Sequence, residues 1–153
     1  MRNRHAFRLA HWDYRENGAY FVTICTHRRR AVFGEIRGHV MGLNRFGCVV
    51  WNEWELLGQR RAEVILDEMI VMPNHIHLIL FIEREGGKPD IDFETTNRLM
   101  SGSLGAIIRG FKSGVSREIG RMRGQKTEVW QGRYWERVVR DERELDLMRQ
   151  YIR

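Results

Sequence analysis

Two apolar segments of strand length, residues 64–72 and 75–82, are separated only by Pro73 and Asn74. A proline and an asparagine between two such segments are typical of a turn, so we expect the segments to pair as an antiparallel hairpin. The longest apolar run, residues 76–82, is far shorter than the ~20 residues of a membrane-spanning helix. The pattern therefore favours a globular fold, and no membrane-spanning helix is expected.

One strand and one helix are expected before the hairpin, and two further helices and a strand after it. The helices are predicted from apolar residues at helical spacing, which follow the N-cap candidates Asn44, Ser103 and Asp141. The predicted elements are a strand over 18–26, helices from 44 to 58 and from 103 to 119, a strand over 129–140 and a helix over 141–153. This order predicts an α+β fold of the ferredoxin-like split βαβ type. It is a four-stranded antiparallel sheet with helices packed on one face, followed by a C-terminal helix.

The length of 153 residues fits one domain, spanning 1–153. Within this domain we expect a basic and aromatic arm over 1–17, a loop or short extended pieces over 31–42, and a flexible loop insertion over 83–98. The two cysteines have neither the spacing of a metal site nor that of a disulfide framework. The N-terminal residues lack the apolar core of a signal peptide, which favours the cytoplasm.

Basic residues concentrate in two parts of the chain. Residues 1–30 carry a net charge of +5 and residues 98–137 a net charge of +6, whereas residues 31–97 carry −5. If the fold brings the two basic segments together, they form one positive face of the kind that binds polyanions. Arginine accounts for 23 of the 26 basic residues, and its planar fork suits phosphate oxygens. A GC-rich genome also explains the arginine bias, although it does not explain the segregation along the chain.

His75 and His77 begin the second strand of the hairpin. Residues i and i+2 of a strand point to the same face with Cα atoms ~6.6 Å apart, so the two imidazoles can bind one ion. Ile76, Leu78 and Leu80 then face a core on the other side. A lone H-x-H pair is also explained by two structural histidines. Two polar rings on one face of a central strand need hydrogen-bond partners, an ion or a cover.

Tyr151 lies near the end of the last predicted helix. Leu145, Met148 and Ile152 mark a packed stripe on this helix, and Tyr151 forms an i, i+4 pair with Leu147 beside that stripe. A tyrosine at this spacing also fits simple packing with its hydroxyl in water. The other tyrosines, which compete for any tyrosine role, are Tyr14, Tyr20 and Tyr134.

Four stretches of the chain resemble the single-tyrosine HUH transposases, and most of all the branch of REP-associated tyrosine transposases. They are residues 8–29, 66–82, 103–113 and 129–152. The most specific features are the sequence MPNHIH, which contains the histidine pair, and the sequence QYI, which contains Tyr151. The resemblance implies a ferredoxin-like fold and an enzyme of DNA transposition and recombination that cleaves and rejoins single-stranded DNA next to small hairpins.

The resemblance also implies roles for particular residues. His75 and His77 match the metal ligands of the family, and the implied cofactor is a divalent metal, Mg²⁺ or Mn²⁺. Tyr151 matches the nucleophile, which forms a 5′-phosphotyrosine intermediate, whereas Tyr134 does not. Family members differ in whether the tyrosine acts in its own protomer or in that of a homodimer partner, so this point stays open.

The implied partner is single-stranded or hairpin DNA. The residues that we expect to contact its phosphates and bases are Arg4, Arg8, Trp12, Tyr14, Arg28, Arg29, Arg30, Arg109 and Lys112. In the family an amide side chain four residues after the nucleophile completes the metal site, and that position would be 155, beyond Arg153. The alternative function is therefore a non-catalytic module, domesticated or truncated, that binds such DNA. An RNA-binding domain of the RRM type shares the topology but needs stacking aromatics where the histidine pair lies.

Overall fold

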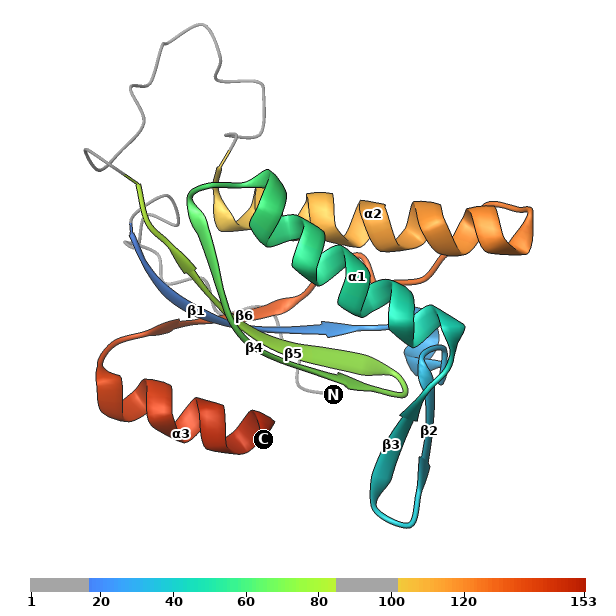
Figure 1. Cartoon of the computed structure of the whole chain (residues 1–153), viewed down its shortest axis with the longest axis horizontal. Coiled ribbons are helices and arrows are strands. Elements are labelled where there is room, and N and C mark those ends of the chain that lie inside the picture. The colour runs from blue at the N-terminus through green and yellow to red at the C-terminus, as the bar shows by residue number, and fades with distance from the viewer. Residues whose placement is uncertain (1–16, 85–101) are drawn as a thin grey trace, which may run out of the picture.

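The computed structural model describes residues 17–84 and 102–153, which form a four-stranded antiparallel sheet with helices on both faces and a separate two-stranded hairpin (Figure 1). The elements are β1 (Gly18–Cys25), η1 (His27–Arg29), β2 (Gly34–Arg37), β3 (Val40–Leu43), α1 (Arg45–Arg60), β4 (Val64–Met72), β5 (His75–Ile82), α2 (Leu104–Arg123), β6 (Trp135–Val139) and α3 (Glu142–Ile152). The sheet order β4-β5-β1-β6 confirms the predicted ferredoxin-like arrangement. The predicted arm and most of the predicted loop insertion lie outside the described residues.

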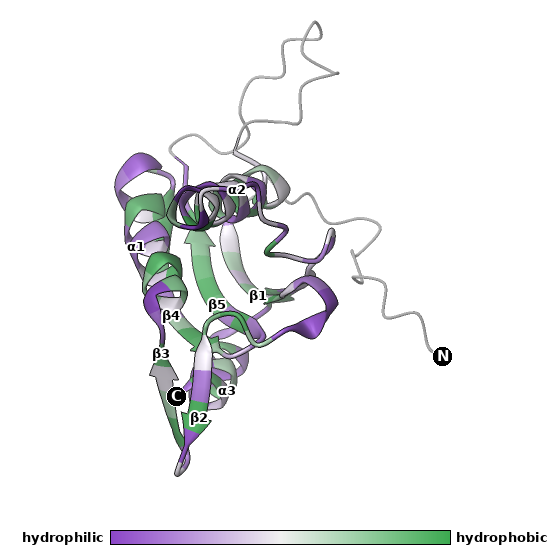
Figure 2. Cartoon of the chain, turned by 90° about the vertical axis from the view of Figure 1, so that its right-hand side faces the viewer, coloured by the Kyte–Doolittle hydropathy of each residue, from purple (hydrophilic) through white to green (hydrophobic). Residues whose placement is uncertain are grey.

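The sheet separates two apolar clusters of unequal size. Helices α1 and α2 cover one face, and α3 crosses the other (Figure 1). The larger cluster lies beneath α1 and α2 and contains Ile76, Leu78 and Leu80, as the alternation along the hairpin predicts. Strand β5 is accordingly mostly green in Figure 2, where α1 at its left and α2 above it carry both apolar and polar stretches. The smaller cluster, beneath α3, consists of Phe21, Ile79, Leu145 and Ile152.

Helices α1, α2 and α3 each begin directly after a predicted N-cap residue. The side chain of Asn44 accepts hydrogen bonds from the backbone of Phe46 and Gly47, and Ser103 and Asp141 cap α2 and α3 in the same way. Helix α2 continues past its predicted end and stops at Gly124, whose φ of +69° closes a left-handed cap. No helix within the described ranges is long and apolar enough to cross a membrane.

The hairpin of β2 and β3 spans residues 34–43, where residues 31–42 were predicted as a loop or short extended pieces. The turn uses two residues with positive φ, Gly38 and His39. Gly34 has a φ of +146°, and a Cβ atom added there would lie 2.0 Å from the carbonyl oxygen of Gly42. The hairpin therefore requires a glycine at position 34, because the partner strand leaves no room for a Cβ atom. This requirement comes from the pairing of the two strands and is not visible in the local sequence.

The predicted strand over 129–140 is wrong in its first half, because β6 begins at Trp135. Before that point one isolated bridge joins Trp130 to Thr26. The Trp130 ring turns into the larger cluster, 5.1 Å from the Phe33 ring, and its indole N–H donates to the carbonyl of Lys112. Packing of this ring takes the segment out of the sheet.

Candidate functional site

The two histidines of β5 project from the same face of the sheet, as predicted. Their ring centroids are 4.8 Å apart, and both side chains are half-buried. The antiparallel register places His77 opposite Thr23 and His75 opposite Cys25 on β1. Both rings lie on the face that α3 crosses, away from the larger apolar cluster.

Each histidine uses its Nδ1 atom in a hydrogen bond. Nδ1 of His75 lies 2.7 Å from Oδ1 of Asn74, and Nδ1 of His77 lies 2.8 Å from Oγ1 of Thr23. An amide oxygen only accepts, so Nδ1 of His75 carries the proton and its Nε2 keeps a lone pair. The Thr23 hydroxyl can accept from His77 in the same way, which leaves both Nε2 atoms available to an ion. Sequence reasoning missed Thr23 and Asn74; the β1–β5 pairing was the signal that could have found the first.

Both imidazoles favour the neutral form. Burial, together with the neighbouring His75, lowers the pKa of His77 to about 4. Burial lowers the pKa of His75 as well, and the positive charge of Arg29 adds to this effect. A neutral imidazole presents its lone pair without first losing a proton, so the pair is ready to bind a cation at neutral pH.

Tyr151 lies beside this pair in the same chain. Its ring centroid is 5.3 Å from that of His77 and 6.3 Å from that of Phe21, and the residue is 70% exposed. Among the competing tyrosines, Tyr20 is fully buried in the larger cluster. Tyr134 is half-buried and precedes β6 instead of lying within a strand. Tyr14 lies outside the described residues.

The histidines and Tyr151 share an open cavity of about 870 Å³. Its further lining includes Thr23, Cys25, Arg29, Gln131, Arg133, Tyr134, Trp135, Arg137 and Glu144. Within residues 17–84 and 102–153 no group of three or more His, Cys, Asp or Glu side chains could hold a metal ion. Among these four residue types, an ion bound here would therefore have only the two histidines as ligands from these ranges, and oxygen ligands would complete its shell.

The three consecutive arginines of the η1 region face different cavities. Arg29 lines the cavity of the histidines, whereas Arg28 and Arg30 line a second one of about 580 Å³ with Arg123 and Lys126. Arg28 and Arg29 both have left-handed backbone conformations, with φ of 52° and 57°. Adjacent non-glycine residues in this region are strained, and such strain is typical of functional turns.

The other predicted DNA contacts are dispersed. Arg109 and Lys112 line a third cavity of about 870 Å³ beside α2. The Lys112 ammonium donates to the carbonyl of Gln131 at 2.6 Å, and burial lowers its pKa. In the described part of the chain, no carboxylate pairs with Arg28, Arg29, Arg30 or Arg109. Arg4, Arg8, Trp12 and Tyr14 lie outside the described residues.

The fold is that of the REP-associated tyrosine transposases. A solved structure of such a transposase bound to a REP hairpin matches 90% of this chain with a TM-score of 0.57 and 19% identity, and this chain spans 65% of its length. A candidate transposase from Deinococcus radiodurans matches 89% of this chain, over 88% of its own length, with a TM-score of 0.51 and 14% identity.

A Haemophilus influenzae protein, described as uncharacterized, is 34% identical over 158 residues, which cover 99% of this chain and 87% of that protein. The chain belongs to the same family as this protein. No family model matches the sequence.

Proposed function

We propose that this protein is a metal-dependent DNA transposase that cleaves and rejoins single-stranded DNA near hairpins through Tyr151. The observation that carries the proposal is the juxtaposition, in one chain, of two neutral histidines with free Nε2 atoms and an exposed phenol 5.3 Å away between ring centroids. Packing alone does not account for this arrangement, because a polar pair on a central strand and a solvent-facing tyrosine bury little apolar surface.

The donor set suits a divalent cation. Two imidazoles with their Nδ1 atoms already held in hydrogen bonds would supply two nitrogen ligands through Nε2, and oxygen ligands would complete the octahedral shell of such an ion. Mn²⁺ fits the nitrogen ligands, whereas Mg²⁺ favours oxygen and is more available in cells. Such an ion, when bound, would stabilise the negative charge that develops on a scissile phosphate.

Tyr151 supplies the nucleophile in this proposal. Its Oη atom attacks the phosphorus, the bond from phosphorus to the 3′ oxygen breaks, and a proton completes the 3′-hydroxyl that leaves. The phenol proton passes to solvent, to which the residue is open. The product is a 5′-phosphotyrosine that keeps a phosphodiester-like bond. A different 3′-hydroxyl can attack it and rejoin the strand without ATP.

The arginines without carboxylate partners are the proposed DNA-binding groups. Arg29 lies in the cavity of the histidines and would contact the phosphate that is cut. Arg28, Arg30 and Arg109 line the two neighbouring cavities and would contact flanking phosphates, which fix register without reading sequence. The likeness to a transposase bound to a REP hairpin supports a hairpin as the partner.

The test incubates the protein with a labelled hairpin-containing DNA strand and Mn²⁺. We expect a protein–DNA adduct that survives denaturation and is lost in Tyr151→Phe. Tyr134→Phe is the matched control, because Tyr134 lines the same cavity, and this variant should still form the adduct. His75→Ala should abolish the adduct while DNA retention stays near that of the wild type.

The alternative is the non-catalytic DNA-binding module. DNA binding by the wild type with no adduct under any divalent metal would establish this alternative and end the proposal of catalysis. Loss of DNA binding and adduct together in His75→Ala would instead assign the histidine a structural role.

A further inference from the structure

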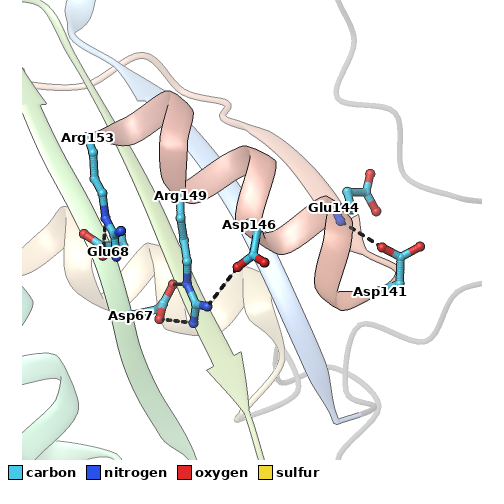
Figure 3. Close-up of polar contacts among 7 residues, drawn as sticks. All are labelled: Asp67, Glu68, Asp141, Glu144, Asp146, Arg149 and Arg153. Carbon is cyan, nitrogen blue, oxygen red and sulfur yellow. Dashed lines mark hydrogen bonds and ion pairs between the residues drawn. The ribbon is translucent and has the colours of Figure 1, made fainter.

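Helix α3 is tied to both edges of the sheet. At its N-terminal end Glu144 pairs with Arg137 of the edge strand β6 and accepts a hydrogen bond from the backbone of Arg140. At its C-terminal end Arg149, and Arg153 four residues later, bind carboxylates of the other edge strand, β4 (Figure 3). The helix therefore spans the face that carries the histidines, and its two ends are anchored separately.

The anchor on β4 depends on a bulge. Leu66 pairs with Leu80 and Met69 pairs with Leu78, so Asp67 and Glu68 together oppose the single residue Ile79. In a regular strand neighbouring side chains point to opposite faces. The extra residue breaks this alternation, which turns two consecutive carboxylates toward α3 while Leu66 and Met69 both pack against the larger cluster.

Two arginines of α3 meet these carboxylates. The guanidinium of Arg149 binds Asp67 through two hydrogen bonds of 2.8 and 2.6 Å, and both side chains are half-buried. Arg153 donates to Glu68 at 3.1 and 2.7 Å in a more exposed position. A two-point contact between planar groups restricts orientation more strongly than a single ion pair does.

Tyr151 lies between these arginines in sequence but on the opposite flank of the helix. At 3.6 residues per turn, a separation of two residues corresponds to about 200° of rotation about the axis. The inward side of α3 is occupied by Leu145 and Ile152. One flank is thus held to the β4 bulge while the other places the phenol beside His77.

This geometry makes the position of the phenol sensitive to rotation of α3. The phenol oxygen lies roughly 9 Å from the helix axis if the side chain is extended from a Cα radius of 2.3 Å, so a rotation of ~20° moves the oxygen by about 3 Å. A displacement of about 1 Å already costs on the order of 100-fold in rate when reacting groups must be aligned.

We propose that Asp67 and Arg149, assisted by Glu68 and Arg153, are positioning residues that fix the rotation of α3 and hold Tyr151 over the histidine pair. This inference rests on the proposed function for its effect on strand cleavage. The β4 bulge would then have two effects: it interrupts an exposed edge of the sheet, and it presents the carboxylates that hold α3.

The first experiment uses charge reversal. Asp67→Arg and Arg149→Asp, each alone, should slow adduct formation at saturating DNA by 10- to 100-fold and change the Kd for DNA by less than about 3-fold. The double variant D67R/R149D restores the pair in reversed order and should recover the rate to within a few-fold of the wild type. Reversal of the exposed pair Glu118 and Arg121 on α2 is the control and should change neither quantity.

The second experiment needs no catalysis. The chemical shifts of the His77 ring protons report the nearby Tyr151 ring, and Tyr151→Ala defines the value without it. Arg149→Asp should move these shifts toward that value, the reversed pair should return them, and the α2 control should leave them unchanged. The proposal would be overturned if adduct rates and chemical shifts were normal in both single variants. It would also be overturned if the double variant D67R/R149D were as impaired as the single variants. A wild type without adduct but with the expected shifts would refute cleavage and retain the positioning role.

Discussion

The hydrogen bond between Thr23 and His77 offers the most direct test of the histidine pair as a metal site. Thr23→Val keeps the shape and β-branching of the side chain and removes the hydroxyl that lies 2.8 Å from Nδ1 of His77. His77 would then be free to exchange its ring proton between the two nitrogens. The tautomer with a free Nε2 would lose its preference, whereas the apolar contacts of the two strands would persist.

The expected loss of metal affinity follows from what hydrogen bonds to ligating histidines contribute in other metal sites. Removal of a group that orients a ligating histidine typically costs 10- to 100-fold in metal affinity, about 1.4–2.7 kcal/mol. Titration with Mn²⁺, followed by the electron paramagnetic resonance signal of the free ion, measures this loss of metal affinity. The wild type and His77→Ala serve as the references. Thr127→Val is the control, because its hydroxyl donates to the carbonyl of Gln125 and the residue does not line the cavity of the histidines. Metal binding that is normal in Thr23→Val and lost in His77→Ala would refute the orienting role.

Three further predictions concern stability, pH and salt. Gly34→Ala should lower the free energy of unfolding by about 2 kcal/mol or more in urea, because its Cβ would meet the Gly42 carbonyl and its φ is +146°; a neutral result would contradict the close approach. Without metal, the free energy of unfolding should fall as the pH is lowered from 6.5 to about 4, because unfolded His77 takes up a proton that folded His77 does not. His77 contributes a slope of up to ~1.4 kcal/mol per pH unit, which His77→Ala removes while the contribution of His75 remains. Affinity for a labelled hairpin should fall steeply with added salt, and Arg109→Ala should lower the log–log slope by about one; a flat response in the wild type would exclude phosphate binding.

The sheet and the helix starts were predictable because each rests on local signals. The alternation of apolar residues along β5 and the cap residues Asn44, Ser103 and Asp141 act within a few residues of their own positions. Short extended pieces were allowed for over 31–42, but their pairing as the β2–β3 hairpin was not predicted, because it depends on the contact of Gly34 with Gly42 across two strands. The first half of the predicted last strand failed for the same kind of reason, since the burial of the Trp130 ring is decided by partners far away in sequence.

The site was predictable only in part. The same-face geometry of His75 and His77 follows from the period of a strand, whereas the place of Tyr151 beside them follows from how α3 crosses the sheet. The adjacent polar pair Asp67 and Glu68 within an apolar strand was a visible signal of the bulge. Its meaning depends on Arg149, which is distant in sequence and meets Asp67 only after folding.

The two faces of the sheet explain why the site lies under α3. The face beneath α1 and α2 is sealed by the larger cluster, and a DNA strand could not reach a group there without opening the core. The smaller cluster on the other face has four buried residues in the described part of the chain, and a helix of 11 residues is marginal without tertiary contacts. A larger helix would cover the histidines and exclude substrate, whereas no helix would leave Phe21 and Ile79 exposed. A short helix held at both edges covers the apolar part of this face, leaves the histidine pair open to the cavity, and makes the tyrosine depend on its anchors.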